Sequence, residues 1–297
     1  MQGQMTIASC VKNILKYKRL SMLQDNDKTI VTVTYDKERY FLELHIRSIN
    51  KYLEPCEIIL IYCDKHNKYD DWLFWVNNNI SPLAPKHKIV TYNAEFFYDI
   101  SKVISWQSFA YSLRIFCSTV VNTENYWILD TKVFFFKPTT FDQLLEQYPR
   151  NLLDTDFEEV LREIQSYYSI INTYFKTNVT PFKFNTAIAK LMVEKGINFN
   201  NTNEGYAEIY YYQAFCFKNG IQLTSGSCDV NNSIAYPGYN YSSKQLIAYM
   251  KSKDPAVRCT GIHKLVAEKL DKNTFNVIIA YVGGKDLIPI TTPWVFN

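Results

Sequence analysis

Asp130 and Lys132 are the two side chains of this chain best placed to do chemistry. They lie in the segment YWILDTKVFFFKP (residues 126–138), between two apolar runs that are typical of buried strands. A carboxylate in such a place is costly unless it has a partner. A carboxylate can bind a divalent cation, and a lysine can contact a phosphate oxygen as a point charge. The segment therefore predicts a polar binding site. The alternative is that Asp130 caps a turn and Lys132 points to solvent.

Two further acids directly follow predicted strands. The β-branched, apolar segment 29–35 (TIVTVTY) ends at Asp36, and the segment 57–63 (EIILIYC) ends at Asp64. In open α/β folds the carboxyl ends of the strands form the ligand-binding edge of the sheet. Acids at three such ends therefore indicate a binding site. The alternative for Asp36 and Asp64 is turn and cap chemistry, which aspartate also favours.

Helical and strand-like segments alternate through the first half of the chain. We predict helices at residues 39–53, 71–77 and 105–121, and further strands at 88–92 and 126–129. Strands that alternate with helices imply a mostly parallel sheet with helices on both faces. The predicted fold class is therefore α/β, with a Rossmann-like sheet in one domain.

The second half of the chain is less regular. Thr155 and Glu158 match a capping box, which predicts a helix to about residue 172. Asp154 and Asp156 form a literal Asp-x-Asp, but the chemistry of a helix start explains both acids, and no strong strand leads into them. Thr180-Pro181 opens another helix candidate, at 186–194. A further helix is predicted near 265–270.

Composition narrows the class of protein. With 297 residues and 47% apolar content, the chain can bury a sizeable core. Its 23 Tyr, 19 Phe and 5 Trp suit contact with sugars, and equally suit an ordinary core. The net charge of +3, with both signs mixed, argues against a nucleic-acid binder.

Cysteine usage and hydropathy indicate a soluble, cytoplasmic type of protein. The 7 cysteines are scattered without a CxxC pair, so neither a zinc site nor a disulfide framework is favoured. No apolar run approaches the length of a transmembrane segment. The sequence leaves the oligomeric state open.

Several short motifs occur along the chain in a fixed order. They are Thr34-Tyr35-Asp36, Trp106-Gln107, residues 126–138, Thr180-Pro181, Glu208 with Tyr212, and Gly261-Ile262-His263-Lys264. Together the motifs resemble a largely uncharacterised family of GT-A-like glycosyltransferases, found in bacteria and large algal viruses. In that family the segment at 126–138 holds an Asp-x-Asp motif that binds a divalent cation and the donor diphosphate. Here Lys132 stands at its third position.

The resemblance implies a single GT-A-like domain at residues 29–297 after a leader at 1–28. A nucleotide-sugar half would span 29–140 and an acceptor half 141–297. The implied activity is transfer of a sugar from a UDP- or GDP-type donor to a glycan or glycoconjugate acceptor, in the host cytoplasm if the protein is viral. The alternative is a non-catalytic GT-A-like domain that binds a glycan or a partner protein.

The residues and the resemblance together predict a set of roles. Glu208 lies among tyrosines and is expected to bind acceptor hydroxyls or act as a base, with a helix-surface charge as the alternative. Thr180 and Tyr212 are expected at the acceptor. The residues expected to bind the nucleotide sugar are Thr34, Tyr35, Asp36, Asp64, Trp106, Gln107, Arg114, Asp130, Lys132 and Lys264.

The same segments bear on whether the protein uses a metal ion. Asp130 and His263 are the candidate ligands for Mn²⁺ or Mg²⁺, although His263 could equally serve as a structural hydrogen-bonding residue. Lys132 would repel a cation placed beside it. We therefore expect weak or absent metal dependence, with Lys132 in contact with a phosphate oxygen and Arg114 and Lys264 assisting.

Overall fold

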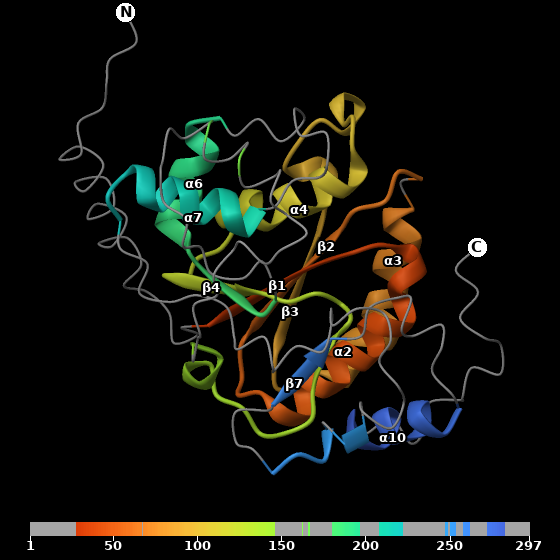
Figure 1. The fold of residues 1–297 in the computed structure, drawn as a ribbon. Helices are drawn as coiled ribbons and strands as arrows, with labels where there is room; N and C mark the ends of the chain where they lie inside the picture. Colours follow the sequence, from red (N-terminus) through yellow and green to blue (C-terminus); the bar gives the residue numbers. More distant parts are fainter. Residues whose placement is uncertain are drawn as a thin grey trace, which may run out of the picture.

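The computed structural model describes most of the first half of the chain and several parts of the second. The described residues are 28–66, 68–145, 180–196, 208–221, 250–253, 258–261 and 272–282, with single positions at 162, 166, 247 and 248. A twisted central sheet lies between two layers of helices (Figure 1). The predicted α/β fold class is therefore confirmed.

The central sheet has five strands in the order β3-β2-β1-β4-β6. The strands are β1 (Thr29–Thr34), β2 (Glu57–Tyr62), β3 (Lys88–Asn93), β4 (Asn125–Ile128) and β6 (Phe182–Asn185). The pairs between β3, β2, β1 and β4 are parallel, and β6 pairs antiparallel with β4. The carboxyl ends of β1, β2 and β4 therefore lie at one edge of the sheet, as the acids after them predicted.

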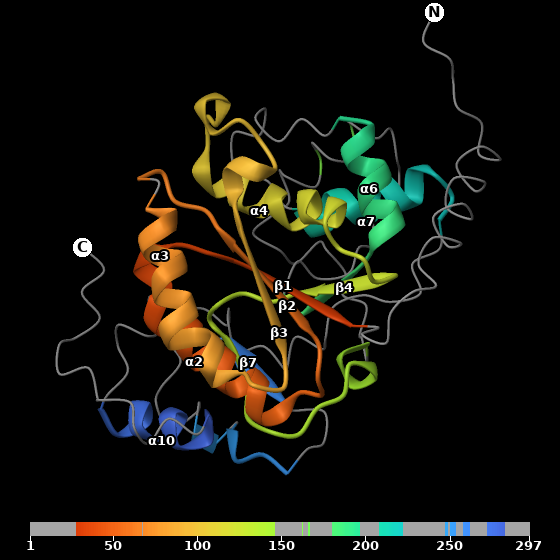
Figure 2. The ribbon, with the colours of Figure 1, turned by 180° about the vertical axis from the view of Figure 1, so that it is seen from behind.

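Helices cover both faces of this sheet (Figure 2). On one face are α4 (Trp106–Phe116), α6 (Thr186–Glu194) and α7 (Glu208–Lys218), and on the other are α2 (Arg39–Tyr52) and α3 (Tyr69–Trp75). Successive strand residues point to opposite faces. Val31 packs into the core with α4, and Ile30 into the core with α2. Because both faces are buried, these strands read as continuous apolar runs.

A second, two-stranded sheet lies against α2. It pairs β5 (Val133–Phe135) antiparallel with β7 (Cys259–Gly261). Side chains of α2 supply further hydrogen bonds to β5. His45 Nδ1 bonds the carbonyl of Val133, and the backbone N–H of Phe135 donates to Ser48 Oγ over 3.1 Å. Helix α2 thus fixes the strand that follows the Asp130–Lys132 segment.

The helix α10 (Lys272–Val282) is tied to the end of α2. Lys51 Nζ and Tyr52 Oη both donate to the carbonyl oxygen of Tyr281, at 2.6 and 2.7 Å. A lysine at a helix carboxyl end also interacts favourably with the helix dipole. These two bonds attach the last described helix to the layer that carries β5.

Three elements differ from the sequence prediction. The apolar run at 133–136 forms a strand, but in the small sheet. The helix predicted at 105–121 ends at Phe116 and continues as a short 3-10 helix, Cys117–Thr119. Thr180-Pro181 leads into β6, which was not predicted, before the expected helix α6 begins at Thr186. The helices predicted to residue 172 and near 265–270 fall outside the described residues.

Candidate functional site

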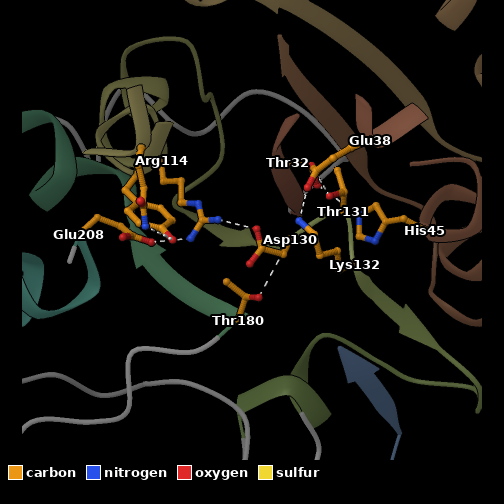
Figure 3. A network of polar contacts seen from close by, with 11 residues as sticks. Thr32, Glu38, His45, Arg114, Asp130, Thr131, Lys132, Thr180 and Glu208 are labelled. Carbon is orange, nitrogen blue, oxygen red and sulfur yellow. Dashed lines mark hydrogen bonds and ion pairs between the residues drawn. The ribbon is translucent and has the colours of Figure 1, made fainter. Parts of the chain in front are cut away.

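A network of charged side chains occupies the carboxyl edge of the sheet (Figure 3). It consists of two ion-paired groups that meet at the segment from Asp130 to Lys132. One group joins Asp130 to Arg114 and Glu208, and the other joins Lys132 to Glu38. Three helical elements and the end of β4 supply these residues. Together they hold three carboxylates and two cations in alternation.

Arg114, near the end of α4, bridges two carboxylates. Its Nη1 donates to Glu208 Oε1 at 2.7 Å, and its Nη2 donates to Asp130 Oδ1 at 2.6 Å. The guanidinium also lies 4.9 Å from the centre of the Tyr111 ring. Burial disfavours the charge, but Asp130 and Glu208 outweigh it and raise the pKa of Arg114. Arg114 is therefore a fixed cation whose terminal nitrogens both have carboxylate partners.

The two carboxylates on Arg114 differ in exposure and in the direction in which their pKa values are shifted. Glu208 is 1% exposed, and burial raises its pKa despite the opposing charge of Arg114. Burial also acts against the Asp130 carboxylate, but Arg114 and Lys132 outweigh it and hold its pKa below the usual value. The Asp130 side chain keeps 30% exposure. Asp130 is therefore the more acidic of the two carboxyls and the one that faces solvent.

Lys132 is paired with a carboxylate that the sequence did not point to. Its Nζ contacts Glu38 Oε1, while Thr131 Oγ1 donates to Glu38 Oε2 at 2.6 Å. Burial works against the ammonium, but Glu38 and Asp130 outweigh it and raise the pKa of Lys132. Burial and the Glu38 charge raise the pKa of Tyr35 to about 12. Tyr35 is therefore a hydroxyl donor at neutral pH.

The backbone of the Asp130–Lys132 turn is held from several sides. The N–H of Val133 donates to the carbonyl of Asp130 at 2.9 Å, and the N–H of Asp130 reaches Thr180 Oγ1 at 3.4 Å. His45 Nε2 lies 3.2 Å from Thr32 Oγ1, and its other ring nitrogen bonds Val133. Burial lowers the pKa of His45 to about 4, so the ring is neutral at neutral pH. Thr180 thus contacts the turn itself.

The acids after β1 and β2 come together as parallel pairing predicts. Thr34 pairs with Tyr62 in the sheet, and both Asp36 and Asp64 act on the Tyr62 hydroxyl, whose pKa burial raises to about 12. Asp36 accepts from Arg39 Nε at 2.8 Å. Asp64 makes a local bond of the turn kind, since the N–H of His66 donates to its Oδ1 at 3.0 Å, whereas the described bonds of Asp36 go to the Arg39 side chain. The buried hydroxyl of Thr34 has no hydrogen-bond partner among the described residues.

One face of α4 leads from solvent to this network. Gln107, Tyr111 and Arg114 are spaced along a single helix face. Gln107 is exposed, and its Nε2 approaches Tyr111 Oη at 3.4 Å. Trp106 is half-buried and packs edge-on against Phe109 at 5.9 Å. The predicted Trp106-Gln107 pair is therefore near the start of the helix whose other end holds Arg114.

Two predicted acceptor-side residues have other surroundings in the structure. Tyr212 is 2% exposed, packs against Phe184 at 4.6 Å, and accepts a hydrogen bond from the N–H of Asn185. Tyr212 is therefore a residue of the hydrophobic core. Glu208 is buried against Arg114, so the alternative of a charge on the helix surface is wrong. Its expected role as an acceptor contact or a base stays a prediction. His263, Lys264, Asp154 and Asp156 lie outside the described residues.

Four further residues of the site, Glu38, Thr131, His45 and Tyr111, were not predicted from the sequence. A detectable signal existed for Tyr111, which stands four residues after Gln107 and three before Arg114 on the predicted helix. Glu38 and Thr131 gave no periodic signal, because their contact joins segments 93 positions apart. His45 lies at the buried face of the predicted helix 39–53, which is where an apolar residue was expected.

The described residues do not fit a divalent cation. Within them, no three His, Cys, Asp or Glu side chains are grouped to hold a metal ion. Asp130 already accepts from Arg114, and the ammonium of Lys132 is close by. Two cationic side chains would repel a metal ion placed on this carboxylate.

The charged network lies outside the carboxyl ends of the strands, which is where open α/β sheets bind ligands. Among solved structures, the chain is similar to the bifunctional glycosyltransferase WbbM in its apo form, at 12% identity and a TM-score of 0.52. The match covers 92% of this chain and 51% of WbbM, so the chain spans about half of that protein. At this identity the likeness shows the fold alone.

Two further structures are similar at lower scores. The galactosyltransferase LgtC, solved with donor and acceptor sugar analogs, matches at 13% identity and a TM-score of 0.47, over 88% of this chain and 98% of LgtC. The apo form of the glycosyltransferase GlyE of Streptococcus pneumoniae TIGR4 matches at 12% identity and 0.45, over 86% and 60%. No protein-family model and no curated protein sequence matches the chain. None of the described helices has the length and apolar character needed to cross a membrane.

Proposed function

We propose that this protein transfers a sugar from a nucleoside-diphosphate sugar to a glycan or glycoconjugate acceptor. The observation that carries the proposal is the position of Asp130 and Lys132. These oppositely charged, partly exposed side chains lie at the sheet edge where Asp36 and Asp64 also end their strands. The fold that holds them is shared with a solved glycosyltransferase.

The nucleoside part of a UDP- or GDP-type donor is assigned to the ends of β1 and β2. The Asp36 and Asp64 carboxylates can accept hydrogen bonds from ribose hydroxyls or base N–H groups. The Tyr35 hydroxyl is protonated at neutral pH and hydrogen-bonded to Glu38, and its oxygen can accept a further hydrogen bond. The Thr34 hydroxyl, which has no described partner, can do either.

The diphosphate is assigned to Lys132, whose side chain keeps 23% exposure. A lysine contacts phosphate as a point charge and needs no special geometry. Lys264 remains a proposed second contact. Because the described donor set does not fit a divalent cation, we propose weak or absent dependence on Mn²⁺ or Mg²⁺. Asp130 with His263 is the set to examine if a metal is required.

The sugar and the acceptor are assigned to the region beside Asp130. The exposed Asp130 carboxylate can accept from sugar hydroxyls, and Trp106 and Gln107 offer an aromatic face and an amide at the start of α4. Glu208 serves as a positioning residue, because it reaches Asp130 only through Arg114. Thr180 is also a positioning residue, because its hydroxyl oxygen accepts from the backbone N–H of Asp130.

Binding of nucleotides tests the proposal directly. Calorimetry with UDP, GDP and their sugars, with and without Mn²⁺, should show binding by at least one nucleoside diphosphate. A mass readout should then show donor hydrolysis or transfer. If no nucleoside diphosphate binds under either condition, the proposal is wrong. Binding of glycans without nucleotides would instead indicate a non-catalytic glycan-binding domain.

A further inference from the structure

We propose that Glu38 competes with the donor diphosphate for Lys132 and thereby sets how strongly the site discriminates a diphosphate from an uncharged nucleoside. This inference rests on the proposed function. It assigns to Glu38 the role of a specificity-determining residue, because the carboxylate occupies the ammonium that the diphosphate must contact. Three features of the network support it.

The first feature is that Glu38 cannot move with Lys132. Its side chain is 3% exposed, and its second oxygen is held by Thr131 at 2.6 Å. Thr131 is itself 1% exposed and belongs to the turn that the backbone of Val133 closes. Glu38 is therefore a fixed negative charge behind the site.

The second feature is that Lys132 can move. Among the described residues its ammonium has one carboxylate partner at hydrogen-bonding distance, Glu38, and 23% of its side chain reaches solvent. A lysine side chain has several rotatable bonds and turns easily toward a new anion. A phosphate entering from solvent can thus share the ammonium or take it from Glu38.

The third feature is the contrast with Arg114. Its side chain is 8% exposed, and its two terminal nitrogens are each bonded to a carboxylate. Releasing Arg114 would leave the buried Glu208 without its ion-pair partner, which is strongly unfavourable. Of the two cations in the described network, Lys132 is therefore the one that a ligand can recruit.

Competition by Glu38 lowers the affinity of the site for a diphosphate, and so narrows its preference for a diphosphate over an uncharged nucleoside. A diphosphate brings more negative charge to Lys132 than a single carboxylate does, so it can displace Glu38. An uncharged nucleoside leaves the Lys132–Glu38 pair intact, so the pair does not change the affinity for the nucleoside. Removing the Glu38 charge should therefore strengthen diphosphate binding and leave nucleoside binding unchanged.

Calorimetry on the full chain tests this with four variants: Glu38→Gln, Lys132→Ala, the double variant, and Glu57→Gln as a control. Glu57 also pairs with a lysine, but at the opposite edge of the sheet. The probes are UDP, GDP, uridine and guanosine. Glu38→Gln should bind the diphosphate about tenfold tighter, at the lower end for one charge-assisted contact, with unchanged nucleoside affinity. The gain should vanish in the double variant, and Glu57→Gln should match the parent.

Several results would overturn the inference. Unchanged or weaker diphosphate binding by a folded Glu38→Gln variant would show that Glu38 positions Lys132 for the ligand. A gain that persists without Lys132 would point to a different cation. If Glu38→Gln does not fold, Glu38→Asp retains the charge with a shorter reach, and the same tightening in a smaller amount is expected. If the parent binds nucleosides and no diphosphate, or binds no nucleotide, the proposed function fails as well.

Discussion

Two lysine–glutamate pairs at opposite edges of the sheet share their chemistry and differ in their surroundings. At the amino edge, Lys88 pairs with Glu57 at 2.7 Å, with side chains 63% and 13% exposed. At the carboxyl edge, Lys132 pairs with Glu38, with side chains 23% and 3% exposed. An exposed pair adds little to stability, and a buried pair often costs more in desolvation than it returns.

This difference indicates what each pair is for. The amino-edge pair joins the first residues of β2 and β3 in register and remains in water. The carboxyl-edge pair takes both charges largely out of water, beside a second buried ion-paired group on Arg114. Because stability alone does not favour such a concentration of charge, the carboxyl edge is the place to look for function.

The largest expected effect is on stability, at Arg114. Arg114→Met leaves Glu208 buried without its ion-pair partner, and we expect the free energy of unfolding to fall by about 3–5 kcal/mol. Chemical denaturation measures this. Adding Glu208→Leu should restore part of the loss, since no unpaired charge then remains at that position. If Arg114→Met lowers the free energy of unfolding by no more than a change at an exposed ion pair does, Arg114 is not the partner of a buried charge.

The next effect is on binding, at Lys132. Lys132→Ala should weaken diphosphate binding roughly tenfold to hundredfold, because a hydrogen bond to a charged group contributes about 1.5–3 kcal/mol. Nucleoside binding should stay the same, and Lys88→Ala provides the matched control. Lys132→Asp rebuilds an acidic pair with Asp130 and should make binding depend on Mn²⁺ or Mg²⁺.

One outcome would contradict the role of Lys132 as a replacement for a metal cation. If the parent protein is strictly metal-dependent and Lys132→Ala leaves diphosphate affinity unchanged, Lys132 does not replace a cation. The metal site would then be sought at Asp130 with His263, or at Asp154 and Asp156.

A smaller effect separates the two carboxylates on Arg114 by pH. The pKa of Asp130 is lowered on folding, so its stabilising contribution is present at neutral pH and is lost as pH falls below about 4. The pKa of Glu208 is raised, so its contribution is lost as pH rises above about 4. The difference in free energy of unfolding between the parent and Asp130→Asn should therefore shrink as the pH falls. The difference between the parent and Glu208→Gln should shrink as the pH rises. Denaturation curves across this range measure both differences, and slopes of the same sign would contradict the assignment.

The smallest effect is expected at the amino edge. Lys88→Ala should change the free energy of unfolding by less than about 1 kcal/mol, because the pair is exposed and screened by salt. Nucleotide affinity should be unaffected. A loss comparable to that of Arg114→Met would mean that exposure does not separate the two edges.

The sequence predicted the sheet better than the charge network. Strands β1 and β2 were readable because burial on both faces leaves long apolar runs, and Asp36 and Asp64 mark their ends. Strand β6 could not be predicted in this way, because its four residues alternate in burial and follow a Thr-Pro pair that is typical of a helix start.

The pairing of charges follows from three-dimensional packing, which local patterns do not contain. Asp130 was predicted to need a partner, and the cost of a buried carboxylate made that inference possible. Its partner Arg114 comes from α4, and the next carboxylate, Glu208, lies 94 positions further along the chain from Arg114. Lys132 was expected to be available for phosphate, whereas Glu38 holds it in the structure.

The attachment of α10 to α2 has a consequence for synthesis of the chain. Lys51 and Tyr52 are synthesised 230 and 229 residues before Tyr281, whose carbonyl they bind. At typical elongation rates of roughly 5–20 residues per second, that delay lasts on the order of 10–50 s. During it β5 also lacks its partner β7, whose first residue is Cys259, so α2 holds β5 through His45 and Ser48 alone among the described bonds. A nascent chain paused before residue 259 would therefore present an unpaired strand edge directly beside the Asp130–Lys132 turn, where a chaperone or a second nascent chain could bind first.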